Sequence, residues 1–515
     1  MQIEKARKRK REWLVAGLGV LVLLFVVVPG QAREAPEPAH GGTLTLGVEL
    51  PIRGFDAIKA RFLIRGGRTV VDLVEDPLFL RDEKGELVPH LGLKAEVSED
   101  GKTWTVPLRE GVEFHDGTPF NADAVVHHWR RLLDPEKRFY RRDLLRPVKS
   151  VEKVDDFTVR FHLLHPWTPF RSILSGEGGL VSHIPSPKAV EEGDQNERPV
   201  GTGPFLFKEW KRGDRIVVER NPGYWKKGQP YLDRVVVRVL PDHQSRFAAL
   251  KAGEADLITT DMGVHIREAQ SDSSLSVLES DANGAEIIYF NMGKPPLDDE
   301  RVRQAIAHAH DQPMHLELVY EGTVPFARHP FGRALGCGDT GYREHDPEKA
   351  RALLAEYGQP VELELMHTNT SRGRKTGEIF RQNMKEAGIS VKPVGVEPTM
   401  MIQRVFMDNY QASTWRIPDM DYVSLYLRMV LHSRSPRNRI HYSSSKMDAL
   451  LQEIATTTEP SRRGELRCEM ARRINEDLPF IYRSGSRFHV LFRPQVRGIM
   501  GVRNGAPRLR EAWLE

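Results

Sequence analysis

Apolar positions along this chain follow two different periods, which alternate from segment to segment. Residues 41–48 switch between polar and apolar side chains, as a strand with one buried face does. The same alternation flanks the tight-turn sequence Glu99-Asp100-Gly101 within residues 94–110, which predicts a β-hairpin. Residues 299–310 instead space their apolar side chains three and four positions apart, which predicts an amphipathic helix.

Start and stop signals extend this alternation along the chain. Asn121 is placed to cap a helix, and Asp346-Pro347 joins an N-cap residue to proline at the first helical position. Gly388 ends a further helix. Strands alternating with helices on this scale predict α/β domains. The other predicted helices are 69–76, 374–387, 446–456 and 460–476, and the other predicted strands and hairpins are 154–159, 361–365 and 389–396.

Length and composition bound the class of protein. A chain of 515 residues is too long for one hydrophobic core, so two or three domains are expected. Hydrophobic residues make up 40% and charged residues 28%, as in a soluble globular protein.

The N-terminal segment has the layout of a secretory signal. Residues 1–12 hold six Lys/Arg, Trp13–Val28 is uncharged and apolar, and Gly30-Gln31-Ala32 offers small residues for cleavage. We therefore expect residues 1–32 to be a cleaved signal peptide and the mature protein to reach the periplasm. The alternative is an uncleaved membrane anchor, although the apolar run is just short of the ~17–25 residues of a spanning helix. No Cys follows the run, which disfavours a lipid anchor.

Removal of residues 1–32 changes the charge. Lys+Arg falls from 75 to 69 and Asp+Glu from 71 to 69, so the formal net charge falls from +4 to 0. The basicity of the whole chain belongs to the signal segment. It gives no argument for binding to nucleic acid or to a membrane surface.

The two cysteines, Cys337 and Cys468, lie far apart in the sequence. Secretion permits a disulfide, but the sequence leaves open whether they pair. Two thiols without Cys or His at ligand spacing disfavour a structural zinc site. His115 likewise has no partners at ligand spacing and is expected to be a packed or hydrogen-bonded turn residue. No metal and no cofactor are expected.

Five sequence blocks occur in an order that resembles one family. They include SEDGKTWT at 98–105 with FHDG at 114–117, PVGTGP at 199–204 and NPGYW at 221–225. The remaining blocks are the segment from Phe290 to Ala305 and NEDLPFI at 475–481. Together they resemble the solute-binding proteins of peptide/nickel-type ABC importers, bacterial extracellular solute-binding protein family 5. The resemblance covers nearly all of the chain after the signal segment.

This resemblance implies an α/β, two-lobed periplasmic-binding-protein fold of type II with an inserted extra domain. Lobe I would be discontinuous, and two strands crossing between the lobes, near 287–291 and 480–483, would form the hinge. Ligand held between the lobes would stabilise the closed form. The expected boundaries are 41–56, 183–280 and 486–515 for lobe I, 57–182 for the inserted domain and 281–485 for lobe II.

The resemblance also places a ligand pocket on a second-lobe loop, where this chain departs from the family. Peptide binders carry Asp three residues after the loop Trp, and that Asp pairs with the ligand amine. Here Trp415 is followed at that position by Pro418, and Asp421 falls on the family's later acidic position. A one-residue insertion would instead bring Asp419 onto the amine-binding position, so that Asp is displaced or absent. The departure weakens the peptide interpretation and suggests a ligand without a free amine, held by Arg416. Alternatively, Arg416 pairs with Asp419 or Asp421 and never meets ligand.

Further residues are expected at the cleft by alignment with the family. Arg61, Phe62 and Leu63 follow the first strand, and Tyr482 lies on the returning hinge strand. The aromatic residues either stack on ligand or pack the lobes together. The predicted ligand-binding residues are therefore Arg61, Phe62, Leu63, Trp415, Arg416, Asp419, Asp421 and Tyr482.

The predicted function is the extracytoplasmic receptor of an ABC importer, with a peptide or other small molecule as ligand and an inner-membrane ABC permease as partner. Neither a Gly-x-Ser-x-Gly nor a His-Glu-x-x-His motif occurs, which disfavours a hydrolase. The alternative is a ligand sensor reporting to a membrane receptor, which would share the fold. A monomer is expected. The sequence does not name the ligand.

Overall fold

The computed structural model describes residues 37–60, 65–82, 86–139, 142–175, 181–332, 335–420 and 422–515. The predicted signal peptide, 1–32, lies outside these residues. Pro38–Glu515 form one unit. No helix in the described part of the chain is long and apolar enough to cross a membrane.

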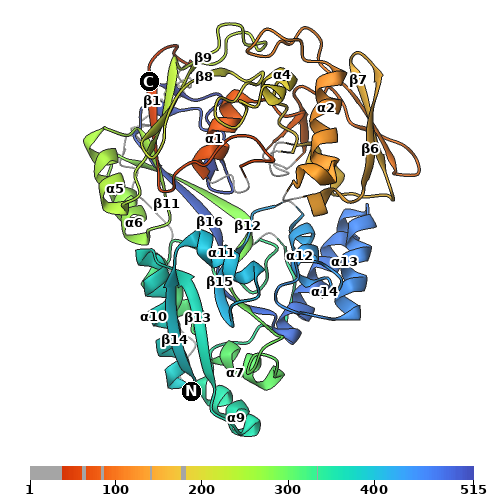
Figure 1. Cartoon of the computed structure of the whole chain (residues 1–515). Helices are drawn as coiled ribbons and strands as arrows, with labels where there is room; N and C mark the ends of the chain where they lie inside the picture. The colour runs from red at the N-terminus through yellow and green to blue at the C-terminus, as the bar shows by residue number, and fades with distance from the viewer. Residues whose placement is uncertain are drawn as a thin grey trace, which may run out of the picture. The chain divides into compact units, whose positions relative to one another are not determined.

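A mixed sheet of ten strands organises this unit (Figure 1). The sheet joins segments from the middle of the chain to segments from both of its ends. Its order is β14 (Ser390–Val396), β13 (Glu362–Thr368), β15 (Ala412–Ile417), β12 (Ser276–Phe290), β16 (Phe480–Phe492), β11 (Leu257–Thr260), β1 (Thr43–Val48), β10 (Arg234–Val239), β9 (Arg215–Arg220) and β8 (Phe205–Lys211).

Strands β12 and β16 are long and antiparallel, and they connect the two halves of the sheet (Figure 1). The last part of β12 also pairs with β15, from Ala285 to Phe290, whereas the last part of β16 pairs with β11. A bulge between Ala282 and Ala285 separates these two parts of β12. Gly284 lies in the bulge with φ +88°, and a Cβ there would lie 2.2 Å from the Ile417 carbonyl oxygen. Only glycine fits this crossing without displacing β15.

Around strands β1 and β8–β11 lies one hydrophobic core, built from alternating residues such as Leu44, Leu46 and Val48. The helices on this side are α1 (Arg65–Val74), α4 (Pro187–Glu191), α5 (His243–Ala252) and α6 (Gly263–Ser271). The C-terminal segment adds the short strands β17 (Val496–Arg497), β18 (Val502–Arg503), β19 (Ala506–Pro507) and β20 (Trp513–Leu514).

A separate four-stranded sheet has its own core around the fully buried Trp129. Trp129 packs edge-on against Phe161 and Phe170. The sheet has the order β4 (Glu96–Val97), β5 (Thr103–Pro107), β7 (Thr158–Leu163) and β6 (Val148–Asp155). Nearby elements are β2 (Phe79–Arg81), β3 (Leu87–Pro89), α2 (Ala122–Leu133), η1 (Pro135–Lys137), η2 (Arg142–Leu145) and α3 (Phe170–Leu174).

Helices flank strands β13–β15 and the adjoining ends of β12 and β16, and two further cores lie between them. Cys337 forms a disulfide with Cys468, which ties the segment before α9 to α14 and answers the pairing that the sequence left open. The helices are α7 (Glu300–Ala309), α8 (Gln312–Tyr320), α9 (Pro347–Tyr357), α10 (Ser371–Glu386), α11 (Pro398–Phe406), α12 (Val423–Leu431), α13 (Ser445–Thr456) and α14 (Pro460–Asp477).

The predicted elements largely agree with these bounds, and the α/β class is confirmed. Asn121 caps α2, since its Oδ1 accepts the Ala124 amide hydrogen at 3.2 Å. His115 is a hydrogen-bonded turn residue, because its Nε2 donates to the Gly203 carbonyl at 2.9 Å. The prediction of a helix over 69–76 was wrong at both ends. α1 ends at Val74 because Asp76 leaves the helix to enter a buried polar network.

Candidate ligand-binding site

Strand β15 brings the predicted pocket loop to the crossing strands. Trp415 lies opposite Ile287 of β12, and Arg416 lies opposite Glu286. Successive side chains of a strand point to opposite faces of the sheet. The side chains of Trp415 and Arg416 therefore lie on opposite faces of the sheet.

Trp415 belongs to an aromatic cluster with Tyr289 and Tyr426. Its ring stacks on Tyr289 with centroids 5.4 Å apart, and its Nε1 donates to the Tyr426 hydroxyl at 2.7 Å. The Tyr289 and Tyr426 hydroxyl oxygens lie 2.6 Å apart. Burial raises the pKa of Tyr289 well above its usual value, so its hydroxyl keeps its proton. These bonds hold the indole in one orientation.

This cluster forms one wall of a cavity of about 170 Å³. Apolar side chains from α11 and α12 line the cavity, together with Pro418 and Met420 of the predicted pocket loop. Leu144 of η2 contributes from the segment 57–182 predicted to be the inserted domain. The polar part of the wall consists of the aromatic hydroxyls and two arginines, and none of the described residues that line it is acidic.

The two cavity arginines differ in their partners. Arg437 Nε donates to Asp143 Oδ2 at 2.8 Å. The guanidinium of Arg439 has no hydrogen bond or ion pair with any described residue, and its Nε is buried. The main chain of Arg439 is fixed, because its carbonyl accepts the Tyr410 hydroxyl at 2.7 Å. A guanidinium does not lose its charge at physiological pH, so this one is an uncompensated cation at an apolar wall.

Arg416 lies outside this cavity and pairs with Glu286. The Glu286 carboxylate also binds Arg483, with Nη2 and Oε2 2.7 Å apart. Burial opposes ionisation of Glu286, but the two arginines hold its pKa at about 2. The sequence alternatives gave Arg416 either a ligand anion or the carboxylates of Asp419 and Asp421. In the structure its partner is Glu286, which strand register, not sequence distance, brings beside it; contact of Arg416 with a ligand anion stays a prediction.

The remaining predicted residues have separate surroundings. Asp419 is buried, and its Oδ1 accepts the Asn283 amide hydrogen at 3.1 Å, which supports the bulge in β12. Tyr482 is 2% exposed and packs edge-on against Phe480. In this structure its ring therefore packs within the protein core. Contact of these residues with ligand stays a prediction. Four predicted residues lie outside the described residues: Arg61, Phe62, Leu63 and Asp421.

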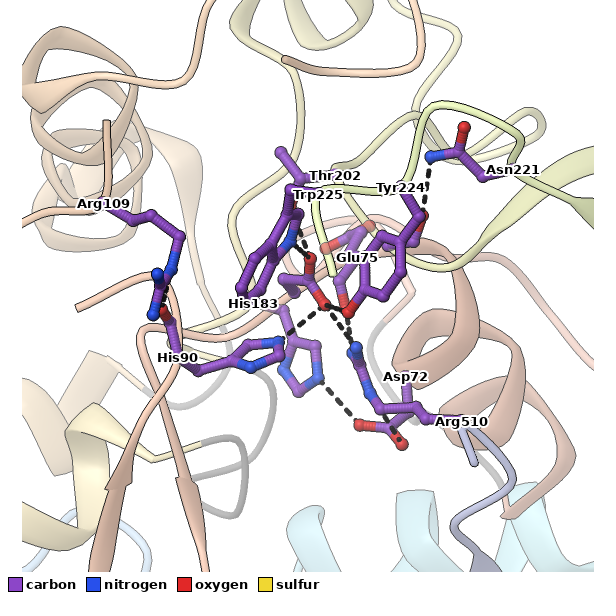
Figure 2. Close-up of polar contacts among 12 residues, drawn as sticks. Asp72, Glu75, His90, Arg109, His183, Thr202, Asn221, Tyr224, Trp225 and Arg510 are labelled. Carbon is purple, nitrogen blue, oxygen red and sulfur yellow. Dashed lines mark hydrogen bonds and ion pairs between the residues drawn. The ribbon is translucent and has the colours of Figure 1, made fainter. Parts of the chain in front are cut away.

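A second polar network surrounds Asp76, which is fully buried. Figure 2 labels its partners His90, Thr202, Trp225 and Arg510. Its carboxylate accepts hydrogen bonds from His90 Nε2 at 2.8 Å, Trp225 Nε1 at 2.8 Å and the Thr202 hydroxyl at 3.0 Å, and it pairs with Arg510. Burial opposes its ionisation, yet the contacts with His90 and Arg510 hold the pKa of Asp76 well below its usual range. The network joins Asp76 to residues that lie 14, 126, 149 and 434 positions away in the sequence.

Two neighbouring carboxyl groups complete this network (Figure 2). Arg510 Nε lies 3.4 Å from Asp72 Oδ2, and His183 Nε2 lies 3.4 Å from Asp72 Oδ1. Burial raises the pKa of Glu75 to about 8, and Gln195 Nε2 donates to its Oε1 at 2.7 Å. Glu75 is therefore a neutral hydrogen-bonding group near neutral pH. These partners are all parts of the protein, which indicates a structural role.

Sequence comparison assigns the chain to a family. The description "Bacterial extracellular solute-binding proteins, family 5 Middle" matches residues 86–435. A heme-binding protein A from Haemophilus influenzae is 30% identical over 449 residues, covering 80% of this chain and 81% of that protein. A glutathione-binding protein from Pectobacterium atrosepticum is 28% identical, covering 92% of each chain.

A solved structure shows the same fold. The periplasmic binding protein DppA from Helicobacter pylori, in complex with the peptide STSA, superposes with a TM-score of 0.83 at 24% identity. The alignment covers 93% of this chain and 99% of that one.

The chain is thus a two-lobed binding protein of type II fold. It belongs to family 5 of the bacterial extracellular solute-binding proteins, the substrate-binding subunits of ABC importers. The family consists of binding proteins that work with an ABC permease, not of enzymes. In the described part of the chain, no group of three or more His, Cys, Asp or Glu is arranged to hold a metal ion.

The sequence did not indicate Tyr289, Tyr426 or Arg439 as parts of a cavity. Tyr289 falls within the predicted hinge strand, 287–291, and no role was predicted for Tyr426. Arg439 belongs to the basic segment RSPRNR, 434–439, which resembles a solvated loop. Only the absence of a counter-ion distinguishes Arg439 from Arg437, and that absence is a property of the folded chain.

Proposed function

We propose that this protein is the periplasmic receptor of an ABC importer and captures a small solute between two lobes. A signal peptide, 1–32, directs export, and the mature chain acts as a monomer that delivers ligand to an inner-membrane permease. Lobe I comprises 41–56, 183–280 and 486–515, the inserted domain 57–182 and lobe II 281–485.

The observation that carries this proposal is the division of β12 and β16 into two parts. The two strands pair with each other over both parts, while β12 also pairs with β15 of lobe II at one end and β16 also pairs with β11 of lobe I at the other. A glycine bulge lies in β12 between the two parts. Two adjacent connections of this kind permit rotation with little change in either core. They support a hinge at the predicted boundary.

Polar contacts between the proposed domains fit a clamp that opens and closes. Arg372 of lobe II pairs with Asp261 of lobe I at 2.6 Å, and Arg53 Nη2 donates to the Thr399 hydroxyl at 2.9 Å. The Arg437–Asp143 pair connects lobe II to the inserted domain. Such contacts contribute little individually when water reaches them, so ligand can decide between open and closed forms.

Native mass spectrometry of the purified protein, followed by denaturation, tests this function. We expect a released small molecule that raises the melting temperature when it is added back. Trp415→Ala should weaken its binding by about 10–100-fold, as for a central aromatic contact. The matched control is Trp210→Ala on β8, away from the cavity. A protein that binds no solute from periplasmic extract would contradict the proposal.

A further inference from the structure

We propose that the cavity beside Trp415 binds the carboxylate of a compact apolar ligand and that Arg439 is its counter-ion. This inference rests on the proposed receptor function and specifies its substrate class. It concerns a residue outside the predicted pocket loop.

The charge of the cavity wall selects an anion. Arg437 is paired with Asp143 across 2.8 Å, whereas Arg439 has no partner among the described residues. Among the residues that the structure describes, no acidic side chain lines the cavity, so this part of the wall offers an amine no counter-charge. Arg439 is partly buried, and its Nε is buried without a hydrogen bond to a described residue, which is unfavourable; a ligand carboxylate would supply the acceptor and the counter-charge.

The other polar groups of the wall limit the charge of that anion. Trp415 Nε1 donates to Tyr426, and the Tyr426 hydroxyl also contacts the Tyr289 hydroxyl. All three donors are neutral, so they add no positive charge to that of the Arg439 guanidinium. The paired N–H donors of one guanidinium match the two oxygens of one carboxylate. A dianion such as phosphate would keep one negative charge without a partner.

The rest of the wall selects an apolar body. Ile402, Val405 and Phe406 come from α11, and Met429 and Val430 come from α12. The cavity has a volume of about 170 Å³, which suits a branched aliphatic group or one aromatic ring. The body would lie against these side chains while the acid group reaches Arg439.

Such an acid has two sources, and paired probes distinguish them. Phenylacetate with phenylacetamide represents a free acid, and the dipeptide Ala-Phe with its C-terminal amide represents a peptide end. We expect at least one acid to bind at least about 10-fold more tightly than its amide, measured by isothermal titration calorimetry. A preference in the first pair assigns a free acid, and a preference in the second pair alone assigns a peptide carboxylate.

Variants of two arginines in one loop test the assignment. Arg439→Gln should abolish the preference for the acid and weaken its binding by about 100-fold. Arg439→Lys keeps the charge but loses the paired donors of the guanidinium, so its affinity for the acid should fall between those of wild type and Arg439→Gln. Arg434→Gln removes the same charge from an exposed position outside the cavity wall and should retain the preference. Circular dichroism and melting temperature establish that each variant is folded.

The inference is overturned when neither acid binds, when acid and amide bind equally, or when Arg439→Gln keeps the preference. These outcomes do not contradict the receptor function if the protein releases a neutral or cationic solute and that solute raises the melting temperature when it is added back. Absence of any stabilising solute contradicts the receptor function itself. The two failures are therefore distinguishable.

Discussion

The Asp76 network and the Trp415 cavity both place charge inside the protein, but only the network is complete. Asp76 is surrounded by His90, Thr202, Trp225 and Arg510, so its charge is balanced by the protein (Figure 2). At the cavity, the guanidinium of Arg439 has no counter-charge among the residues that the structure describes. A completed network fixes the positions of segments relative to one another, whereas an incomplete one marks the place where another molecule completes it.

The Glu286 cluster is intermediate between these two regions. Its carboxylate pairs with both Arg483, which is buried, and Arg416, whose side chain is 33% exposed, so two guanidinium groups share one negative charge. The cluster lies where β12, β15 and β16 meet. Every charged group of the cluster has a partner, and part of the cluster is open to water. Its loss should therefore lower the free energy of unfolding less than loss of the Asp76 network.

The largest effect is expected from Arg510→Met. This change leaves Asp72 and Asp76 buried without their shared cation, and removal of one partner of a buried pair destabilises a protein by ~3–5 kcal/mol. Urea denaturation measures the change. Arg497→Met is the control, since Arg497 pairs with Glu515 at the surface and such pairs contribute ~0–1 kcal/mol. Equal losses from both variants would show that the buried network has no special weight.

A second prediction concerns the pH dependence contributed by Glu75. Its native pKa of about 8 exceeds the ~4.3 of an unfolded chain, so the native state binds more protons between these values. The stability contributed by Glu75 is therefore fully present below pH ~4.3 and is lost as pH rises through 8. The stability difference between wild type and Glu75→Gln should fall by ~2–4 kcal/mol from pH ~5 to ~8.

Comparison with the variant is essential for the Glu75 measurement. Burial lowers the pKa of His90 to about 4, and neutral buried histidines of this kind oppose folding as the pH falls. Their contribution cancels in the difference between the two proteins. A difference that stays constant across this range would mean that Glu75 is ionised in the native state.

A smaller effect is expected from Glu286→Gln. The change leaves Arg416 and Arg483 without their carboxylate, but Arg416 is partly exposed and can turn toward water. We expect a loss of ~1–3 kcal/mol in denaturation experiments, less than for Arg510→Met. Because Glu286 has a pKa of about 2, its contribution is present above pH ~4.3 and is lost as pH falls toward 2. A loss greater than that of Arg510→Met would reverse the comparison.

Local signals allowed much of the fold to be predicted, because they depend on neighbouring residues. The caps Asn121, Asp299 and Asp346 each accept an amide hydrogen at the start of the expected helix. The end of α1 was misplaced because Asp76 is drawn away by Trp225 and Arg510, which are distant in sequence. Tertiary hydrogen bonds decided that boundary.

The candidate site was only partly predictable for the same reason. Trp415 was expected at the pocket and lines the cavity. The partner of Arg416 was not predictable, because Glu286 reaches it through pairing of strands 130 residues apart. Arg439 carried no signal in the sequence, since a missing counter-ion becomes visible only when all its neighbours are placed.

The central claim is that ligand closes two lobes about the crossing of β12 and β16. Small-angle X-ray scattering of the protein, without ligand and then saturated with the solute released from it, tests this claim most directly. The account predicts a smaller radius of gyration with ligand, because only the closed form contacts the solute from both sides. An unchanged radius of gyration at saturating ligand would contradict it.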